Sequence, residues 1–172
     1  MTRAHFLNSN HLLHKAKKTT DLVKAYDHYA HTQKARYSSK NPLDFVVLDE
    51  IYTFVGEKQQ RLYVWTAVGF TPQGERLVWA HVDESKGEDG LLRFLPQLPS
   101  FKKVYSDGNG AYGSVFGTRL TIGKGAQTNL IESVNSQLRQ YVSRLRRKTK
   151  AYTKKMSKLE ENIKAVLIRK II

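Results

Sequence analysis

Three carboxylates occupy positions where an acid is either costly or useful. Asp49 interrupts the apolar run LDFVVLDEIYTFVG, residues 43–56, where an ionised carboxylate is costly unless a positive group pairs with it. Asp107 ends a short apolar strand directly before GNG, and Glu132 is the lone acid in NLIESVNSQLRQYVSRLRRK, residues 129–148. Taken singly, Asp49 is also compatible with a solvent-facing strand end, and Asp107 with a turn.

Taken together, these acids could do metal-dependent phosphate chemistry. Mg²⁺ prefers oxygen ligands and keeps positions open for water and phosphate oxygens. Three carboxylates from two strands and a helix could hold two Mg²⁺ ions, with Mn²⁺ as a substitute. Two such ions clamp the attacking and leaving oxygens of an in-line phosphoryl transfer.

The segment that carries Glu132 has the period of an amphipathic helix. Its apolar residues recur at intervals of three and four and predict a buried stripe, formed by Ile131, Val134, Leu138, Tyr141 and Leu145. Arg139 follows Glu132 by seven residues, so it lies about 20° from it and roughly 10 Å along the axis. The same region predicts a track of DNA-binding groups, namely Asn135, Arg139, Arg146, Arg147 and Lys148. Glu132 would then complete a cation site beside DNA.

The elements that position these residues follow from apolar periodicity and turn signals. Strands are predicted at 43–56, 61–70, 76–85, 102–107 and roughly 118–123, and helices at about 21–37, 87–98, 128–147 and 157–172. The first three strands have short links, which indicates an antiparallel meander. The Gly/Asn-rich segment after Asp107 is predicted to be a loop. This order predicts an α/β protein with a mixed five-stranded sheet flanked by helices.

The net charge of +14 is unevenly distributed along the 172 residues. Residues 1–44 hold 8 Lys/Arg and 3 Asp/Glu (net +5), residues 45–138 hold 9 and 10 (net −1), and residues 139–172 hold 12 and 2 (net +10). A near-neutral centre between basic flanks is typical of an enzyme that binds a polyanion, although a small RNA-binding protein would carry such flanks too. The absence of cysteine excludes disulfides and thiolate metal sites. No run reaches the roughly 20 apolar residues of a membrane span, so no membrane partner is expected.

Four motifs follow one another between about residues 43 and 165: LDEIYTFVG, VWAHV, YSDGNGAY and TNLIESVNSQLRQYVSRLRRK. In this order and at this spacing they resemble the catalytic half of insertion sequence one (IS-one) family transposases, which are DDE enzymes on a ribonuclease-H-like core. The resemblance implies that Asp49, Asp107 and Glu132 are the catalytic, metal-binding triad. Arg139 stands where the family has a phosphate-positioning basic residue. Glu50 also matches the family motif, without an indicated role.

The resemblance also implies a reaction and partners. The reaction would be Mg²⁺-dependent cleavage at the DNA ends of an insertion element, followed by attack of the freed 3′-hydroxyl on target DNA. We expect a homo-oligomer on DNA and a cytoplasmic, nucleoid-associated location in a prokaryotic cell. Complete family members join a zinc-binding and helix-turn-helix segment to this part, often by a programmed frameshift. Without cysteine this chain resembles the downstream frame alone, so the upstream frame is an expected fusion or partner.

We predict three parts along the chain. These are a basic N-terminal extension at 1–42, a ribonuclease-H-like catalytic core at 43–148, and a basic C-terminal helix packed on the core at 149–172. Two alternatives stay open. A non-catalytic nucleic-acid-binding or regulatory transposase fragment explains the basic tail equally well, but not the spacing of the acids. A ribonuclease-H-type nuclease would use the same fold without strand transfer.

Overall fold

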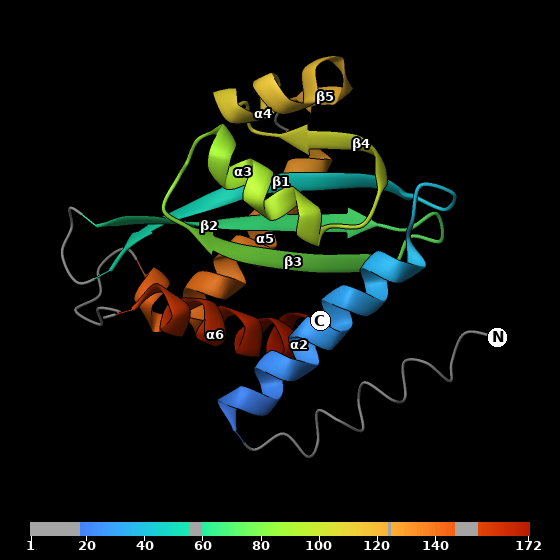
Figure 1. Cartoon of the computed structure of the whole chain (residues 1–172). Coiled ribbons are helices and arrows are strands. Elements are labelled where there is room, and N and C mark those ends of the chain that lie inside the picture. Colours follow the sequence, from blue (N-terminus) through green and yellow to red (C-terminus); the bar gives the residue numbers. More distant parts are fainter. Residues whose placement is uncertain (1–17, 56–59, 124, 147–154) are drawn as a thin grey trace.

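The computed structural model describes residues 18–55, 60–123, 125–146 and 155–172, and its described strands form a single sheet (Figure 1). These strands are β1 (Leu43–Phe54), β2 (Arg61–Phe70), β3 (Arg76–Asp83), β4 (Phe101–Ser106) and β5 (Leu120–Ile122). Their order across the sheet is β3-β2-β1-β4-β5. The β1, β2 and β3 strands form an antiparallel meander, whereas β4 runs parallel to β1 and β5 parallel to β4. The predicted α/β class with a mixed five-stranded sheet is confirmed.

Helices cover both faces of the sheet and one of its edges. They are α2 (Thr19–Arg36), α3 (Glu88–Phe94), α4 (Gly110–Phe116), α5 (Ala126–Tyr141) and α6 (Met156–Val166), and a π-helical turn, Leu167–Ile171, extends α6. In Figure 1, α3 lies in front of the sheet and α5 behind it, while α2 and α6 lie below, next to β3. Each face of the sheet therefore has its own layer of helices.

The central strand β1 is buried on both faces, which explains why apolar residues occupy successive positions before Asp49. Val47 and Ile51 belong to the hydrophobic cluster with α5 and α6, whereas Val46 and Leu48 belong to the cluster with α3 and α4. Successive side chains of a strand point to opposite faces. The two neighbouring acids of β1, Asp49 and Glu50, consequently point to different layers.

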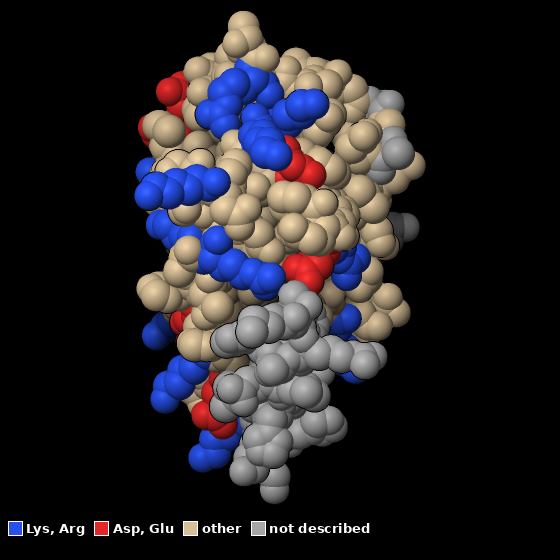
Figure 2. Space-filling view, turned by 90° about the vertical axis from the view of Figure 1, so that its right-hand side faces the viewer, with Lys and Arg blue, Asp and Glu red and all other residues tan. Residues whose placement is uncertain are grey.

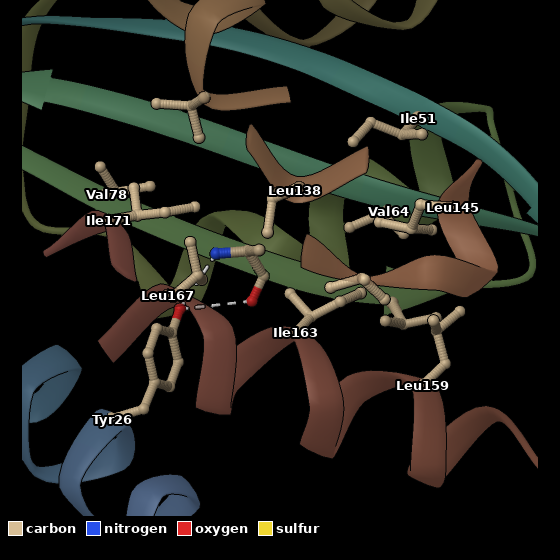
Figure 3. Packing of buried hydrophobic residues seen from close by; sticks show 14 of the residues in the cluster. Tyr26, Ile51, Val64, Val78, Leu138, Leu145, Leu159, Ile163, Leu167 and Ile171 are labelled. Carbon is tan, nitrogen blue, oxygen red and sulfur yellow. Dashed lines mark hydrogen bonds between the residues drawn. The ribbon is translucent and has the colours of Figure 1, made fainter. Parts of the chain in front are cut away.

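Helix α2 covers part of the edge strand β3. The Tyr26 hydroxyl accepts a hydrogen bond from the Ala80 N–H (3.0 Å), and the Tyr29 hydroxyl accepts one from the Val78 N–H (3.0 Å). Figure 3 shows Tyr26 beside Leu167 in the core below the sheet, with its hydroxyl bonded to the strand. Because an unpaired strand edge invites association with another chain, these tyrosines remove a site for strand addition. Part of the segment assigned from sequence to the N-terminal extension thus packs on the core.

The structure differs from the prediction after Asp107, where the expected loop contains helix α4. The Asn109 side chain caps this helix by accepting a hydrogen bond from the Ala111 N–H (3.2 Å). Tyr112 and Phe116 are buried against the sheet, and this burial outweighs the low helix propensity of the glycines. The strand expected at 118–123 is also shorter than predicted. A 3-10 turn occupies Gly117–Arg119, and only Leu120–Ile122 is extended as β5.

The helix that carries Glu132 is also shorter than predicted. Helix α5 ends at Tyr141, and a 3-10 turn, Ser143–Leu145, replaces the expected continuation to residue 147. The change of direction takes Tyr141 off the buried stripe, so its side chain is 46% exposed while Leu138 and Leu145 are buried. The prediction that Tyr141 belongs to the core is therefore wrong.

Candidate active site

Asp49 and Asp107 lie side by side because β1 and β4 run parallel with a constant register. Val47 pairs with Tyr105, and the same offset two residues further sets Asp107 against Asp49. One carboxylate oxygen each from Asp49, Glu50 and Asp107 lies within 4.8 Å of the others. The structure therefore brings together two of the three acids that the sequence singles out, and adds Glu50 to them.

The Asp49 carboxylate is held by hydrogen bonds from two elements. The Asn135 amide of α5 donates to its Oδ2 atom (2.6 Å), and the Glu50 N–H donates to its Oδ1 atom (2.8 Å). The Thr66 hydroxyl of β2 lies 3.0 Å from the Asn135 Oδ1 atom, to which it donates, and so orients the amide. This network fixes Asp49 relative to α5.

Burial raises the pKa of Asp49 to about 6, chiefly because the charged form loses hydration. The Glu50 N–H and the Asn135 amide lower this pKa, whereas the charges of Glu50 and Asp107 raise it further. The largest causes of this shift in pKa include no positively charged side chain. A divalent cation would supply the missing positive charge by displacing the proton.

Glu50 is the third acid of the group, but its carboxylate is already bound on the opposite face of the sheet. Its side chain is 7% exposed, and Lys86 Nζ lies 3.2 Å from its Oε1 atom. The Asn109 amide also donates to Oε1 (3.0 Å), and the Tyr112 hydroxyl donates to Oε2 (2.9 Å). Glu50 is thus neutralised and tied to α4. Its partners are 36 to 62 residues away in sequence, so the motif alone could not reveal them.

Glu132 lies on the exposed side of α5, and within the described part of the chain its carboxylate is not a member of the acidic group. It precedes Asn135 by three residues, which is about one helical turn and roughly 4.5 Å along the axis. Asn135 contacts Asp49 directly. The structure therefore places the backbone of Glu132 about one turn from a residue of the site, with a side chain that is exposed to solvent.

The five residues predicted to bind DNA have different surroundings. Asn135 is 1% exposed, and its amide faces the acids instead of the surface. Arg139 is half-buried and Arg146 is exposed. Arg147 and Lys148 lie outside the described residues. Asn135 was grouped with the surface residues because the helical period places it near Glu132, but period alone cannot show how deeply a helix packs.

The structure is thus an α/β fold in which Asp49, inside the central strand, lies beside Asp107, which directly follows the parallel strand β4. A family model described as IS1 transposase matches residues 44–171. Because this match covers most of the chain, the protein belongs to the IS1 transposase family. This family is built on a ribonuclease-H-like domain, which confirms the predicted fold. A search of the curated proteins finds no match.

Family membership indicates the general class of activity. The chain is related to nucleic-acid-cleaving enzymes of DNA transposition, which act on DNA and use divalent metal ions. The group formed by Asp49, Glu50 and Asp107 is a candidate place for such an ion. Among the described residues, no helix has both the length and the apolar character needed to cross a bilayer.

Proposed function

We propose that the chain is a DDE transposase that catalyses DNA cleavage and strand transfer at the ends of an insertion element. Asp49, Asp107 and Glu132 would be its catalytic, metal-binding triad. The observation that carries the proposal is that carboxylate oxygens of Asp49 and Asp107 lie within 4.8 Å of each other, with α5 bonded to Asp49 through Asn135. This bond holds the helix of Glu132 next to the two aspartates.

The residues present fit Mg²⁺. Carboxylate oxygens are the ligands that this ion prefers, and the raised pKa of Asp49 reflects burial and nearby negative charges. When bound, Mg²⁺ would polarise a phosphoryl oxygen and promote deprotonation of the attacking hydroxyl. Three close carboxylates repel one another unless a cation neutralises them. Glu132, whose side chain is exposed, can rotate toward Asp49 when that charge is balanced.

The reaction consists of two in-line displacements. In the first, a water oxygen attacks a phosphodiester at the element end, and the departing 3′-oxygen takes up a proton. In the second, this 3′-hydroxyl loses its proton, bonds to a target phosphorus and releases a target 3′-oxygen. Both steps have the same geometry, so one set of carboxylates serves both. Arg139 would bind a DNA phosphate, and Asn135 would keep Asp49 oriented.

Glu50 is assigned a positioning role in this scheme. Its carboxylate binds the Asn109 amide, and the Asn109 N–H in turn lies 3.4 Å from the Asp107 Oδ1 atom, to which it donates. The same carboxylate binds Tyr112, whose burial raises its pKa well above the ordinary range and keeps the hydroxyl a donor. Glu50 therefore connects β1 to the turn that carries Asp107.

Tyr112→Phe tests this positioning role, because it removes one hydrogen bond and little volume. We expect Mn²⁺ to bind about 10- to 100-fold more weakly, which is the usual effect of losing a group that orients a metal ligand. Isothermal titration with Mn²⁺ in the absence of DNA gives the measurement. The matched control is Tyr52→Phe, because Tyr52 lies on the same strand as Glu50 but is 53% exposed. Equal Mn²⁺ affinity in both variants would show that Glu50 and Tyr112 do not position Asp107.

Joining of a pre-cut duplex end to a plasmid tests the proposed function itself. The chain, fused behind the upstream reading frame of its element, should produce joined DNA with Mg²⁺ and none with EDTA. Nicking without joining would favour the ribonuclease-H-type nuclease. Binding without either reaction would favour a regulatory fragment.

A further inference from the structure

A hollow of about 460 Å³ lies where the start of α2, the end of α5 and the C-terminal helix meet. We call it the C-terminal groove and define it by six of its lining residues: Tyr141, Ser143, Arg144, Asn162, Arg169 and Lys170. Tyr141, Ser143, Arg169 and Lys170 are exposed, so a macromolecule can reach the groove. Apolar contacts of the core lie beneath it, because Leu167 and Ile171 are buried.

The chemistry of the C-terminal groove is that of an anion site. Three of its lining residues are cations, and no Asp or Glu is among the described residues that line it. Ser143 and Asn162 add a hydroxyl and an amide that can donate hydrogen bonds. The Lys170 ammonium lies 5.8 Å from the centre of the Tyr141 ring, which holds this side chain at the groove. Arginine, lysine, serine and asparagine side chains are the usual donors to DNA phosphates.

The position of the groove relative to the acids favours a DNA backbone over a free anion. Tyr141 follows Glu132 by nine residues on the same helix, which corresponds to about 13 Å along the axis and about half a turn around it. Successive phosphates of one DNA strand are about 3.4 Å apart along the duplex axis. A duplex that crosses the exposed face of α5 would therefore reach the acids and the groove with phosphates that are several nucleotides apart.

We infer that the C-terminal groove binds the sugar–phosphate backbone of duplex DNA, several nucleotides from the phosphodiester that reacts. This inference rests on the proposed function for its choice of substrate. It assigns Arg169 and Lys170 to phosphate contacts and Tyr141 to packing against the sugar. The binding is independent of sequence, because no base edge is needed for any of these contacts.

Other surfaces of the molecule are also basic, so a test needs a control with the same change of charge. Figure 2 shows Lys and Arg side chains spread over the side that lies to the right in Figure 1, with several acids among them. Lys24 and Lys40 are exposed and do not line the groove. Replacing these two lysines removes as much positive charge as replacing Arg169 and Lys170.

The experiment compares Arg169→Gln/Lys170→Gln with Lys24→Gln/Lys40→Gln, using a fluorescent 30-base-pair duplex in EDTA. The groove variant should bind at least about tenfold more weakly near 0.1 M salt, and its salt slope should be shallower by about two, since each lost phosphate contact removes about 0.9. The control variant should match the wild type in slope. An unchanged salt slope and affinity in the groove variant would overturn the inference that the groove binds DNA. The proposed function would be unaffected, because the joining assay tests it separately. Failure of the wild type to bind duplex DNA would overturn both.

A second pair of variants tests the same inference if the double variants fail to fold. Ser143→Asp places a negative charge in the groove, and Ser39→Asp places the same charge at an exposed position outside it. Circular dichroism and thermal melts establish that both variants fold. Ser143→Asp alone should weaken binding to the duplex, by about fivefold or more, and equal affinities for the two variants would contradict the inference.

Discussion

Glu132→Gln should abolish strand transfer while leaving affinity for duplex DNA equal or higher. The substitution keeps nearly the same shape but removes the negative charge of a proposed metal ligand. Metal ions supply several kcal/mol to the transition state of such a reaction, so the rate of joining should fall on the order of a thousandfold. Binding should hold or improve, because a negative charge leaves a surface that faces phosphates. Joining of a pre-cut end and fluorescence anisotropy measure the two quantities.

Glu161→Gln is the matched control for this prediction. Glu161 lies on α6 and pairs with Lys158, so its loss should change neither joining nor binding. Arg139→Ala should behave differently from both, because a phosphate contact serves binding and transfer together. Joining at the parental rate by Glu132→Gln would show that the lone acid of α5 is only a surface residue.

Mn²⁺ should stabilise the folded chain, and Asp49→Asn or Asp107→Asn should remove this effect. A ligand of the native state adds about 2.7 kcal/mol at 100 times its Kd, which corresponds to a rise in Tm of roughly 5–10 °C for a chain of this size. Thermal melts with and without Mn²⁺ measure the rise. Asp44→Asn is the control, because Asp44 is on the same strand but pairs with Lys102. Equal rises in the Asp49 and Asp44 variants would exclude Asp49 as a ligand.

The rise in Tm should itself depend on pH, because Asp49 must lose its proton to bind a metal ion. With a pKa of about 6, Asp49 is mostly protonated at pH 5 and mostly ionised at pH 7. The effect of Mn²⁺ should therefore grow between these values. In EDTA the contribution of Asp49 to the free energy of unfolding changes with pH in the opposite direction. Its pKa is raised from 3.8 on folding, so its contribution to the free energy of unfolding is complete below pH 3.8 and is lost as pH rises through 6.

Local signals in the sequence single out both aspartates as candidate site residues. Asp49 lies in a strand that is apolar on both sides, and Asp107 ends another short strand. The carboxyl ends of parallel strands lie at one edge of a sheet. The register of β1 and β4 then decides that the two acids are direct neighbours, and register depends on packing over the whole sheet.

The contacts of Asn135 and Glu50 could not be predicted in this way. The helical period places Asn135 beside Glu132, but only the depth of α5 on the sheet turns its amide toward Asp49. Glu50 is adjacent to Asp49 in sequence, yet the strand turns it to the other face, toward a helix α4 that has low intrinsic propensity. Both contacts depend on residues far apart in the chain. Local pattern therefore singled out the acids that are proposed to react and missed the groups that hold them.

The most direct test of the proposed triad maps where a bound metal ion lies in the folded chain. Fe²⁺ can occupy oxygen-ligand sites, and with ascorbate and peroxide it generates radicals that cut the nearby backbone. If Asp49, Asp107 and Glu132 form one site, cuts should appear near residues 49, 107 and 132, and excess Mg²⁺ should suppress all three together. Cuts near residues 49 and 107 that leave α5 intact would contradict the triad and remove Glu132 from the site.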